Sequence, residues 1–196
     1  MTIPSKREQT HQRILEVAAR ALRRDGFAGV GVADVMKGAG LTHGGFYAHF
    51  DSREALLVEA LEHADAASTD DLDRRTAALR ADGASPLAAL VTAYLSEEHL
   101  AARESGLGCV VGALGSEMAR QEAPLREVAR SRIERLVRQV QAALEEEGRA
   151  DAADQALALA GAMVGALQIA RTFGPDPQGG AMLAASRQAL LAQYGR

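Results

Sequence analysis

The chain has few of the residues that stabilise disulfide-linked or β-rich proteins. Its 196 residues include one cysteine, no tryptophan and five prolines, and aromatic residues make up 4% of the total. A single cysteine excludes an internal disulfide and suits a reducing compartment. Alternating β-branched residues are nearly absent, whereas alanine is abundant. This composition predicts an all-α protein of one or two domains, large enough to bury a core.

The chain also lacks an obvious targeting or membrane segment. Its N-terminus is charged and polar, without the apolar stretch of a signal peptide. The longest apolar run, residues 156–167, is too short to span a bilayer and indicates a buried helix. We therefore expect a cytoplasmic protein with no membrane partner.

Charge is distributed unevenly along the sequence. The net charge is −4, but residues 1–50 hold seven basic and four acidic residues, a net of +3, so the remainder carries −7. A basic N-terminal part joined to an acidic body is typical of a protein that contacts DNA at one end only.

Residues 31–50, GVADVMKGAGLTHGGFYAHF, are the most informative stretch. Their spacing predicts two short helices joined by a tight turn at Gly40, where glycine can adopt a positive φ. Thr42 is expected to N-cap the second helix through its hydroxyl, with Phe46 and Phe50 on the inner face. The pattern fits a helix-turn-helix whose second helix enters the major groove, and equally a helical hairpin that only packs.

Several residues of this region could contact DNA. The outer face of the second helix is flat because of two glycines, and its N-terminal amides suit a phosphate. Basic residues near the N-terminal arm could add phosphate contacts, whereas most arginines further along residues 6–25 are expected to be solvated. The predicted DNA-binding residues are Thr42, His43, Gly44, Tyr47, His49, Arg53, Lys6, Arg7 and Lys37.

The run VADVMKGAGLTHGGFYAHF is preceded by Gly26-Phe27 and followed by DSREAL. Together these residues, from about 13 to 61, resemble the TetR family of bacterial transcriptional regulators. The segment Tyr-x-His-Phe that ends the run matches the close of the family motif. Arg53 replaces a usual lysine and keeps its charge, whereas Gly31 and Ala48 stand where the family often has residues that contact DNA.

The resemblance implies a homodimeric, ligand-responsive regulator, usually a repressor. Such a protein binds a palindromic operator and is released by a small-molecule inducer held among the middle helices of the body. The resemblance also implies a DNA-binding domain at residues 1–51 and a ligand-binding and dimerisation domain at residues 52–196. The long helix that begins after Ser52 would move the first domain when the second binds its ligand.

Caps and apolar periodicity predict the helices of both domains. One of them, residues 152–172, is apolar on nearly every side and rich in small residues. A second copy of the chain would cover it in a four-helix interface with residues 125–147; the alternative is a central helix of a monomer. The expected helices are residues 6–25, 32–39, 42–50, 52–79, 86–95, 96–103, 109–121, 125–147, 152–172 and 181–194, with a loop at 173–180.

Polar, soft or aromatic side chains within aliphatic faces are the candidates to contact the inducer, although each could equally be core or surface. His99 has no second ligand at metal-binding spacing, so no metal or other cofactor is expected. The predicted ligand-binding residues are Tyr94, His99, Cys109, Met118, Met163, Gln168 and Phe173.

Three alternatives remain open at this point. Cys109, at a predicted helix N-terminus, could sense oxidants or electrophiles with help from His99 and Arg103, or could simply pack. An enzyme would need a nucleophile and base such as Cys109 with His99; no nucleophile elbow or carboxylate pair supports one, so we expect no catalysis. The third is a helical dimer without DNA binding, against which the retained Tyr47 and His49 argue.

Overall fold

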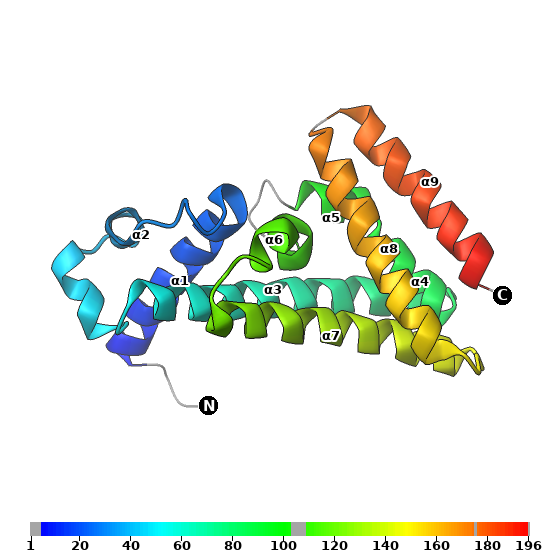
Figure 1. Cartoon of the computed structure of the whole chain (residues 1–196), viewed down its shortest axis with the longest axis horizontal. Helices are drawn as coiled ribbons and strands as arrows, with labels where there is room; N and C mark the ends of the chain where they lie inside the picture. Colours follow the sequence, from blue (N-terminus) through cyan, green and yellow to red (C-terminus); the bar gives the residue numbers. More distant parts are fainter. Residues whose placement is uncertain (1–4, 103–108, 175, 196) are drawn as a thin grey trace.

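The computed structural model describes residues 5–102, 109–174 and 176–195, and within these ranges every regular element is a helix, as predicted. The elements are α1 Lys6–Asp25, α2 Val32–Gly38, the 3₁₀ helix η1 His43–Ala48, α3 Arg53–Ala81, α4 Pro86–Tyr94, α5 Glu97–Ala101, α6 Val110–Met118, α7 Ala123–Glu146, α8 Ala152–Thr172 and α9 Pro177–Tyr194 (Figure 1).

Local signals set most helix ends. Ser5 and Glu8 form a capping box at the start of α1, and Gly26 ends that helix with a φ of 74°. Ser52 and Ser85 accept backbone amides at the starts of α3 and α4. Because these signals are readable in the sequence, the predicted bounds of α1 and α8 are confirmed, and those of α3 and α4 differ by at most a few residues.

The two longest helices form the axis of the molecule. Figure 1 shows α3 and α7 running side by side, with α1, α2 and η1 at one end and α4, α8 and α9 at the other. The short helix α6 lies between the two ends, where it contacts α1, α3, α7 and α8. The N-terminal helices are therefore not a separate appendage, because α6 and α7 pack against them.

Two hydrophobic clusters form the core. The head cluster comprises the buried apolar residues from α1 through the first half of α3, together with Val110, Leu114 and Met118 of α6 and the start of α7. The body cluster comprises those of α4, α8 and the rest of α7, with Leu72 of α3, Cys109 and Val111 at the start of α6, and Leu183 of α9. Helices α3, α6 and α7 contribute to both clusters.

Some expectations about the elements are wrong. Helix α6 ends at Met118 rather than near residue 121. Residues 177–180, expected in a loop, form the first turn of α9, because Asp176 caps it and Pro177 occupies a position that needs no amide donor. The expected short helix after Ser96 ends at Ala101, and its predicted last residue, Arg103, lies outside the described residues.

Two side chains in regions expected to be mostly solvated are buried. Arg23 is buried and donates to the backbone carbonyl of Ala64, so it joins α1 to α3 instead of facing water. Residues 70–75 were expected in a solvated section of the long helix, and within them Leu72 is buried in the body cluster. In both cases a neighbouring helix that is distant in sequence covers the side chain.

Helix α8 is the one helix of the described residues that is long and apolar enough to cross a membrane by length and composition. Such a helix is also common in protein cores, and α8 packs against α7 and α9. One face of α8, with Ala156, Leu159 and Met163, is buried in the body cluster. The opposite face leaves Leu157 and Ile169 64% and 49% exposed.

Candidate DNA-binding element and buried polar site

The second helix of the predicted helix-turn-helix is a 3₁₀ helix rather than an α-helix. Gly40 has a φ of 71°, as the predicted turn requires. Thr42 occupies the N-cap position, but its side chain makes no capping hydrogen bond; its backbone carbonyl accepts from the amide of Gly45 at 3.1 Å. The Gly44-Gly45 pair has low helix propensity, which favours a short, tightly wound turn over a longer α-helix.

The outer and inner faces of η1 differ as predicted. Tyr47 is 73% exposed, and His43, Gly44 and Ala48 are also exposed. On the inner face, the ring of Phe46 is buried and stacks on that of Phe50 with 5.6 Å between ring centroids. The buried rings anchor the element and leave a flat polar face directed outward.

Side chains from α1 hold the end of η1. Arg7 donates to the carbonyl of Ala48 at 2.8 Å, so its guanidinium is engaged with η1. His11 stacks on Phe50 at 4.6 Å and lies 2.7 Å from the Glu59 carboxylate. His49 is half-buried beside these groups; burial, followed by the nearby His11 and Arg7 charges, lowers the pKa of its imidazole. Arg7 is exposed but its guanidinium bonds to η1, and His49 is half-buried, so both side chains contact the protein itself.

Arg53 also turns toward the protein. Its Nε donates to the carbonyl of Val30 at 2.9 Å, and its Nη2 donates to that of Phe27 at 2.5 Å. The guanidinium therefore fixes the connection between α1 and α2. By contrast, Lys6, Lys37 and Thr42 are exposed near η1 or on the helices that flank it.

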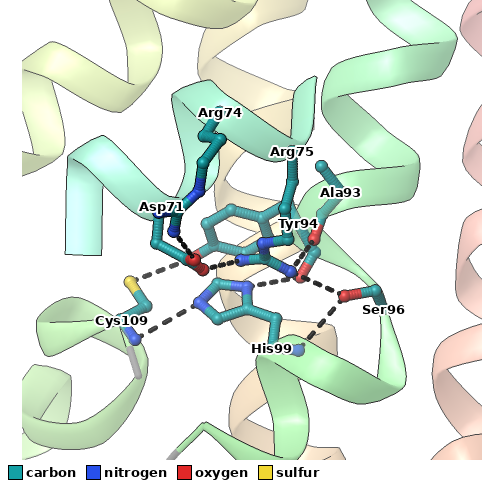
Figure 2. A network of polar contacts seen from close by, with 8 residues as sticks. All are labelled: Asp71, Arg74, Arg75, Ala93, Tyr94, Ser96, His99 and Cys109. Atoms are coloured by element: carbon teal, nitrogen blue, oxygen red, sulfur yellow. Dashed lines mark hydrogen bonds and ion pairs between the residues drawn. The ribbon is translucent and has the colours of Figure 1, made fainter. Parts of the chain in front are cut away.

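Three predicted ligand-binding residues form one buried site, shown in Figure 2. The hydroxyl of Tyr94 lies 3.4 Å from the Cys109 sulfur, and His99 Nδ1 lies 2.6 Å from the Tyr94 carbonyl oxygen. The Cys109 amide donates to His99 Nε2 at 3.2 Å. All three side chains are at most 4% exposed, and we call them the thiol site.

The surroundings of the thiol site alter the acidity of the sulfur. Burial raises the pKa of the Cys109 thiol, but hydrogen bonding and charge from His99, the Arg132 guanidinium and the Tyr94 hydroxyl outweigh it, and the pKa falls to about 6. Burial, and then the adjacent Cys109, raise the pKa of the Tyr94 phenol well above its usual value. These contacts favour the thiolate, the reactive form of cysteine.

The histidine proton can be placed from its partners. Nε2 accepts from the Cys109 amide, so Nδ1 carries the proton and donates to the Tyr94 carbonyl. Next to this site, Arg75 donates to the Ala93 carbonyl at 3.1 Å and the Ser96 hydroxyl at 2.9 Å (Figure 2). These bonds fix the segment between α4 and α5, and with it the orientation of His99.

The other predicted ligand-binding residues do not join the thiol site in the same way. Met163 is buried in the body cluster, whereas Met118 belongs to the head cluster. Phe173 is 39% exposed beyond the end of α8. Gln168 donates to the Val111 carbonyl at 3.3 Å and lines an open cleft of about 380 Å³ between α6 and α8.

Two buried arginines were missed by the sequence reasoning. Arg171 donates to the Cys109 carbonyl at 3.3 Å, and Arg132 pairs with the Asp65 carboxylate between α7 and α3. Arg171 could have been found, because it is the one charged residue of residues 155–172, an otherwise apolar segment. Arg132 gave no such signal, because it lies in a helix with many exposed charges.

A short helix that follows a tight turn, rests on buried rings and presents a flat outer face is the arrangement of a helix-turn-helix DNA-binding protein. Residues 14–60 match the model of bacterial regulatory proteins of the tetR family. Residues 14–60 therefore carry the DNA-binding segment of the TetR family of bacterial transcriptional regulators, and the chain is similar to members of that family.

Relatives with known names agree with this assignment. The transcriptional regulator AcuR of Cereibacter sphaeroides is 30% identical over 109 residues, which are 55% of this chain and 48% of that protein. The uncharacterized HTH-type transcriptional regulator YerO of Bacillus subtilis is 36% identical over 52 residues, 26% of this chain and 18% of that protein. The chain thus matches about half or less of the length of these relatives.

Solved structures share the fold over nearly the whole chain. A TetR-family regulator from Cytophaga hutchinsonii has a TM-score of 0.81 at 19% identity, with 98% of each chain covered. The reduced form of NemR from Escherichia coli has a TM-score of 0.76 at 20% identity, with 93% of this chain and 95% of that chain covered. At these identities the similarity establishes the fold and nothing more about ligands.

Proposed function

We propose that this chain is a cytoplasmic, ligand-responsive repressor that binds a palindromic operator as a homodimer and is released by a small-molecule inducer. The observation that carries the proposal is the outer face of η1, which is exposed within the region that matches the family model. In this proposal, residues 1–51 form the DNA-binding domain. Residues 52–196 form the domain that binds the inducer and the second copy of the chain.

The predicted DNA-binding residues divide into two groups by their contacts. His43 and Gly44 are placed to meet base edges, whereas Tyr47, Thr42 and the two exposed lysines are placed to meet phosphates. Arg7, His49 and Arg53 are instead proposed to orient η1, because their contacts are with the protein backbone or with neighbouring rings.

The second copy is proposed to cover the outer face of α8. This stripe of small and apolar residues includes Gly161 and Gly165, where an added Cβ would meet no atom within 4 Å. The outer face of α7 is less suitable than predicted, because Glu134 pairs with Arg130 and Arg138 in the solvent. The outer face of α9 instead exposes Ala181, Ala184, Ala185, Ala189 and Ala192.

The dimer is therefore proposed to form through α8 and α9 rather than through α7 and α8. Small side chains on both helices let two copies approach closely and bury a continuous apolar area. A two-fold axis through this seam gives one η1 to each half-site of a palindrome.

The inducer is proposed to bind at or beside the thiol site. This site holds polar groups inside an apolar body, the usual composition of a small-molecule site. Of the residues predicted from the sequence, Tyr94, His99, Cys109, Met163 and Gln168 remain the candidates for the contacts.

A second candidate function is oxidant or electrophile sensing through Cys109. One observation favours it. The Tyr94 hydroxyl and the His99 imidazole lie beside Cys109, and the pKa of the Cys109 thiol is lowered to about 6. Addition of an electrophile to the thiolate would enlarge a side chain that is 1% exposed and so displace the start of α6.

The DNA-binding proposal is tested with duplexes that the wild-type chain selects from a random-sequence library. Tyr47→Phe should weaken binding of selected and unselected duplexes alike, by about three- to tenfold, because it removes a phosphate hydrogen bond. His43→Ala should change the preferred sequence. Tyr194→Phe, at the far end of the body, is the matched control. Failure of the wild-type chain to select any duplex would refute the proposal.

The sensing candidate needs a separate test. Wild type and Cys109→Ser are treated with a quinone or with peroxide while bound to the selected duplex. The sensor predicts release from the wild type alone. Equal release by both proteins, or by neither, would assign Cys109 to packing and leave non-covalent induction.

A further inference from the structure

Helix α6 is shared between the two ends of the molecule. It has nine residues, so it is only about 13 Å long. Val110, Leu114 and Met118, spaced four apart, form the face that enters the head cluster. Cys109 precedes the helix as its N-cap, its sulfur accepting from the Gly112 amide at 3.5 Å. One end of α6 therefore begins in the thiol site, and the other reaches the N-terminal helices.

The far end of α6 makes a specific polar contact with the DNA-binding domain. The Glu117 carboxylate accepts from the backbone amide of Phe27 at 3.1 Å. The backbone carbonyl of Phe27 accepts a hydrogen bond from the Arg53 guanidinium. Phe27 is thus held on both sides, by α6 through its amide and by α3 through its carbonyl, at the point where the chain leaves α1 for α2.

The residue before Phe27 allows this contact. Gly26 has a positive φ of 74°, and a Cβ at that position would lie 2.6 Å from a Glu117 carboxylate oxygen. A side chain there would be strained by its backbone conformation and would push the carboxylate away. Gly26 therefore ends α1 and also makes room for Glu117, a function that its sequence context does not reveal.

From these contacts we infer that Glu117 is a positioning residue for DNA recognition, which transmits displacement of α6 at the thiol site to the connection between α1 and α2. The inference rests on the proposed function. A carboxylate hydrogen bond to a backbone amide is directional and charge-assisted. Axial movement or tilting of α6 by a group bound at Cys109 lengthens the bond, and Phe27 is then held by the hydrogen bond from Arg53 alone.

The first experiment removes the contact. Glu117→Ala should speed hydrogen exchange at the Phe27 amide and weaken binding of the selected duplex by about tenfold, with little change in thermal unfolding because the side chain is only half-buried. Glu117→Gln keeps an acceptor oxygen and should retain most of the affinity. Glu127→Ala, which removes an exposed charge from α7, is the control and should match wild type in both readouts.

The second experiment displaces α6 from its other end. N-ethylmaleimide alkylates only Cys109 in this chain, which has a single thiol, and mass spectrometry gives the extent. Alkylated wild type should bind DNA more weakly and exchange the Phe27 amide faster. Alkylated Glu117→Ala should show no further loss. Cys109→Leu adds bulk without a reagent and should behave like the alkylated protein in both backgrounds.

The outcomes separate this inference from the proposed function. A wild-type chain that selects no duplex overturns the proposed function. A wild type that binds DNA, together with a Glu117→Ala variant of unchanged affinity or unchanged Phe27 exchange, overturns the role of Glu117. Equal factors of loss on alkylation, with and without Glu117, show that displacement of α6 reaches the DNA-binding domain by another route and overturn the coupling.

Discussion

The head and body clusters differ in what they bury. The head cluster is built of aliphatic side chains and stacked phenylalanine rings, with Arg23 as a buried charge beside it. The body surrounds Tyr94, His99 and a cysteine with a lowered pKa, and Arg132 and Arg171 lie buried close by. Buried polar and charged groups are costly unless a function maintains them. The comparison supports the proposal that the head presents η1 and that the body binds the ligand.

The largest expected effect tests the apolar head. Phe46→Ala should destabilise the fold by about 3–5 kcal/mol, because removal of a fully packed ring leaves a cavity under η1. Denaturant unfolding measures the change. Tyr47→Ala, one residue further along, should cost under about 0.5 kcal/mol because its side chain faces solvent. Comparable losses of unfolding free energy in the two variants would show that packing of the inner face of η1 does not stabilise the head.

Loss of the buried ion pair between α3 and α7 should destabilise the fold nearly as much. Asp65→Asn should destabilise by about 3 kcal/mol, because it leaves Arg132 buried without a full countercharge. Asp65→Leu combined with Arg132→Met should recover much of this loss in the same denaturant assay. A double variant as unstable as the single one would mean that shape rather than charge governs this contact.

A charge introduced on the outer face of α8 should disrupt the dimer without unfolding the chain. Gly165→Glu should convert a dimer to a monomer in sedimentation, because an unpaired charge in a closed apolar seam costs about 3 kcal/mol or more. Ser131→Glu on the exposed face of α7 is the control. Retention of the dimer by a well-folded Gly165→Glu protein would place the interface elsewhere.

The smallest expected effect concerns pH. The folded pKa of Cys109 is about 6, below its ordinary value of 9.0. The thiolate therefore adds stability that is absent below pH 6, grows between pH 6 and 9, and is complete above pH 9. The difference in unfolding free energy between wild type and Cys109→Ser should follow this course. A difference independent of pH would mean that the thiol stays protonated.

The sequence predicted those parts of the fold that depend on neighbouring residues. The bounds of α1 follow from its caps and apolar periodicity, and those of α8 from apolar periodicity, because the Asp151 side chain makes no capping hydrogen bond. The start of α9 was missed because its two glycines resemble a loop. In the structure Gly179 is buried, and a Cβ there would lie 2.9 Å from the Ala170 carbonyl. This glycine therefore permits close packing of α9 against α8, which no local pattern reveals.

The same limit applies to the candidate site. The outward face of η1 was predictable from spacing. Tyr94, His99 and Cys109 were among seven ligand-binding candidates chosen from their places along apolar faces, but their grouping was not predicted. The roles of Arg23, Arg53 and Glu117 were not predictable, because each side chain contacts a backbone group of an element distant in sequence. Such contacts depend on how the helices are arranged in space.

Because α3, α6 and α7 each bury side chains in both clusters, neither cluster can lose its packing without exposing apolar surface in the other. Heat should therefore unfold the chain in a single cooperative transition, with equal calorimetric and van't Hoff enthalpies. A fragment that ends at residue 51 would lack Leu56, Leu61 and Leu114 as packing partners and would remain largely unstructured. We therefore expect the DNA-binding element to become ordered only after α3 and α6 have been synthesised.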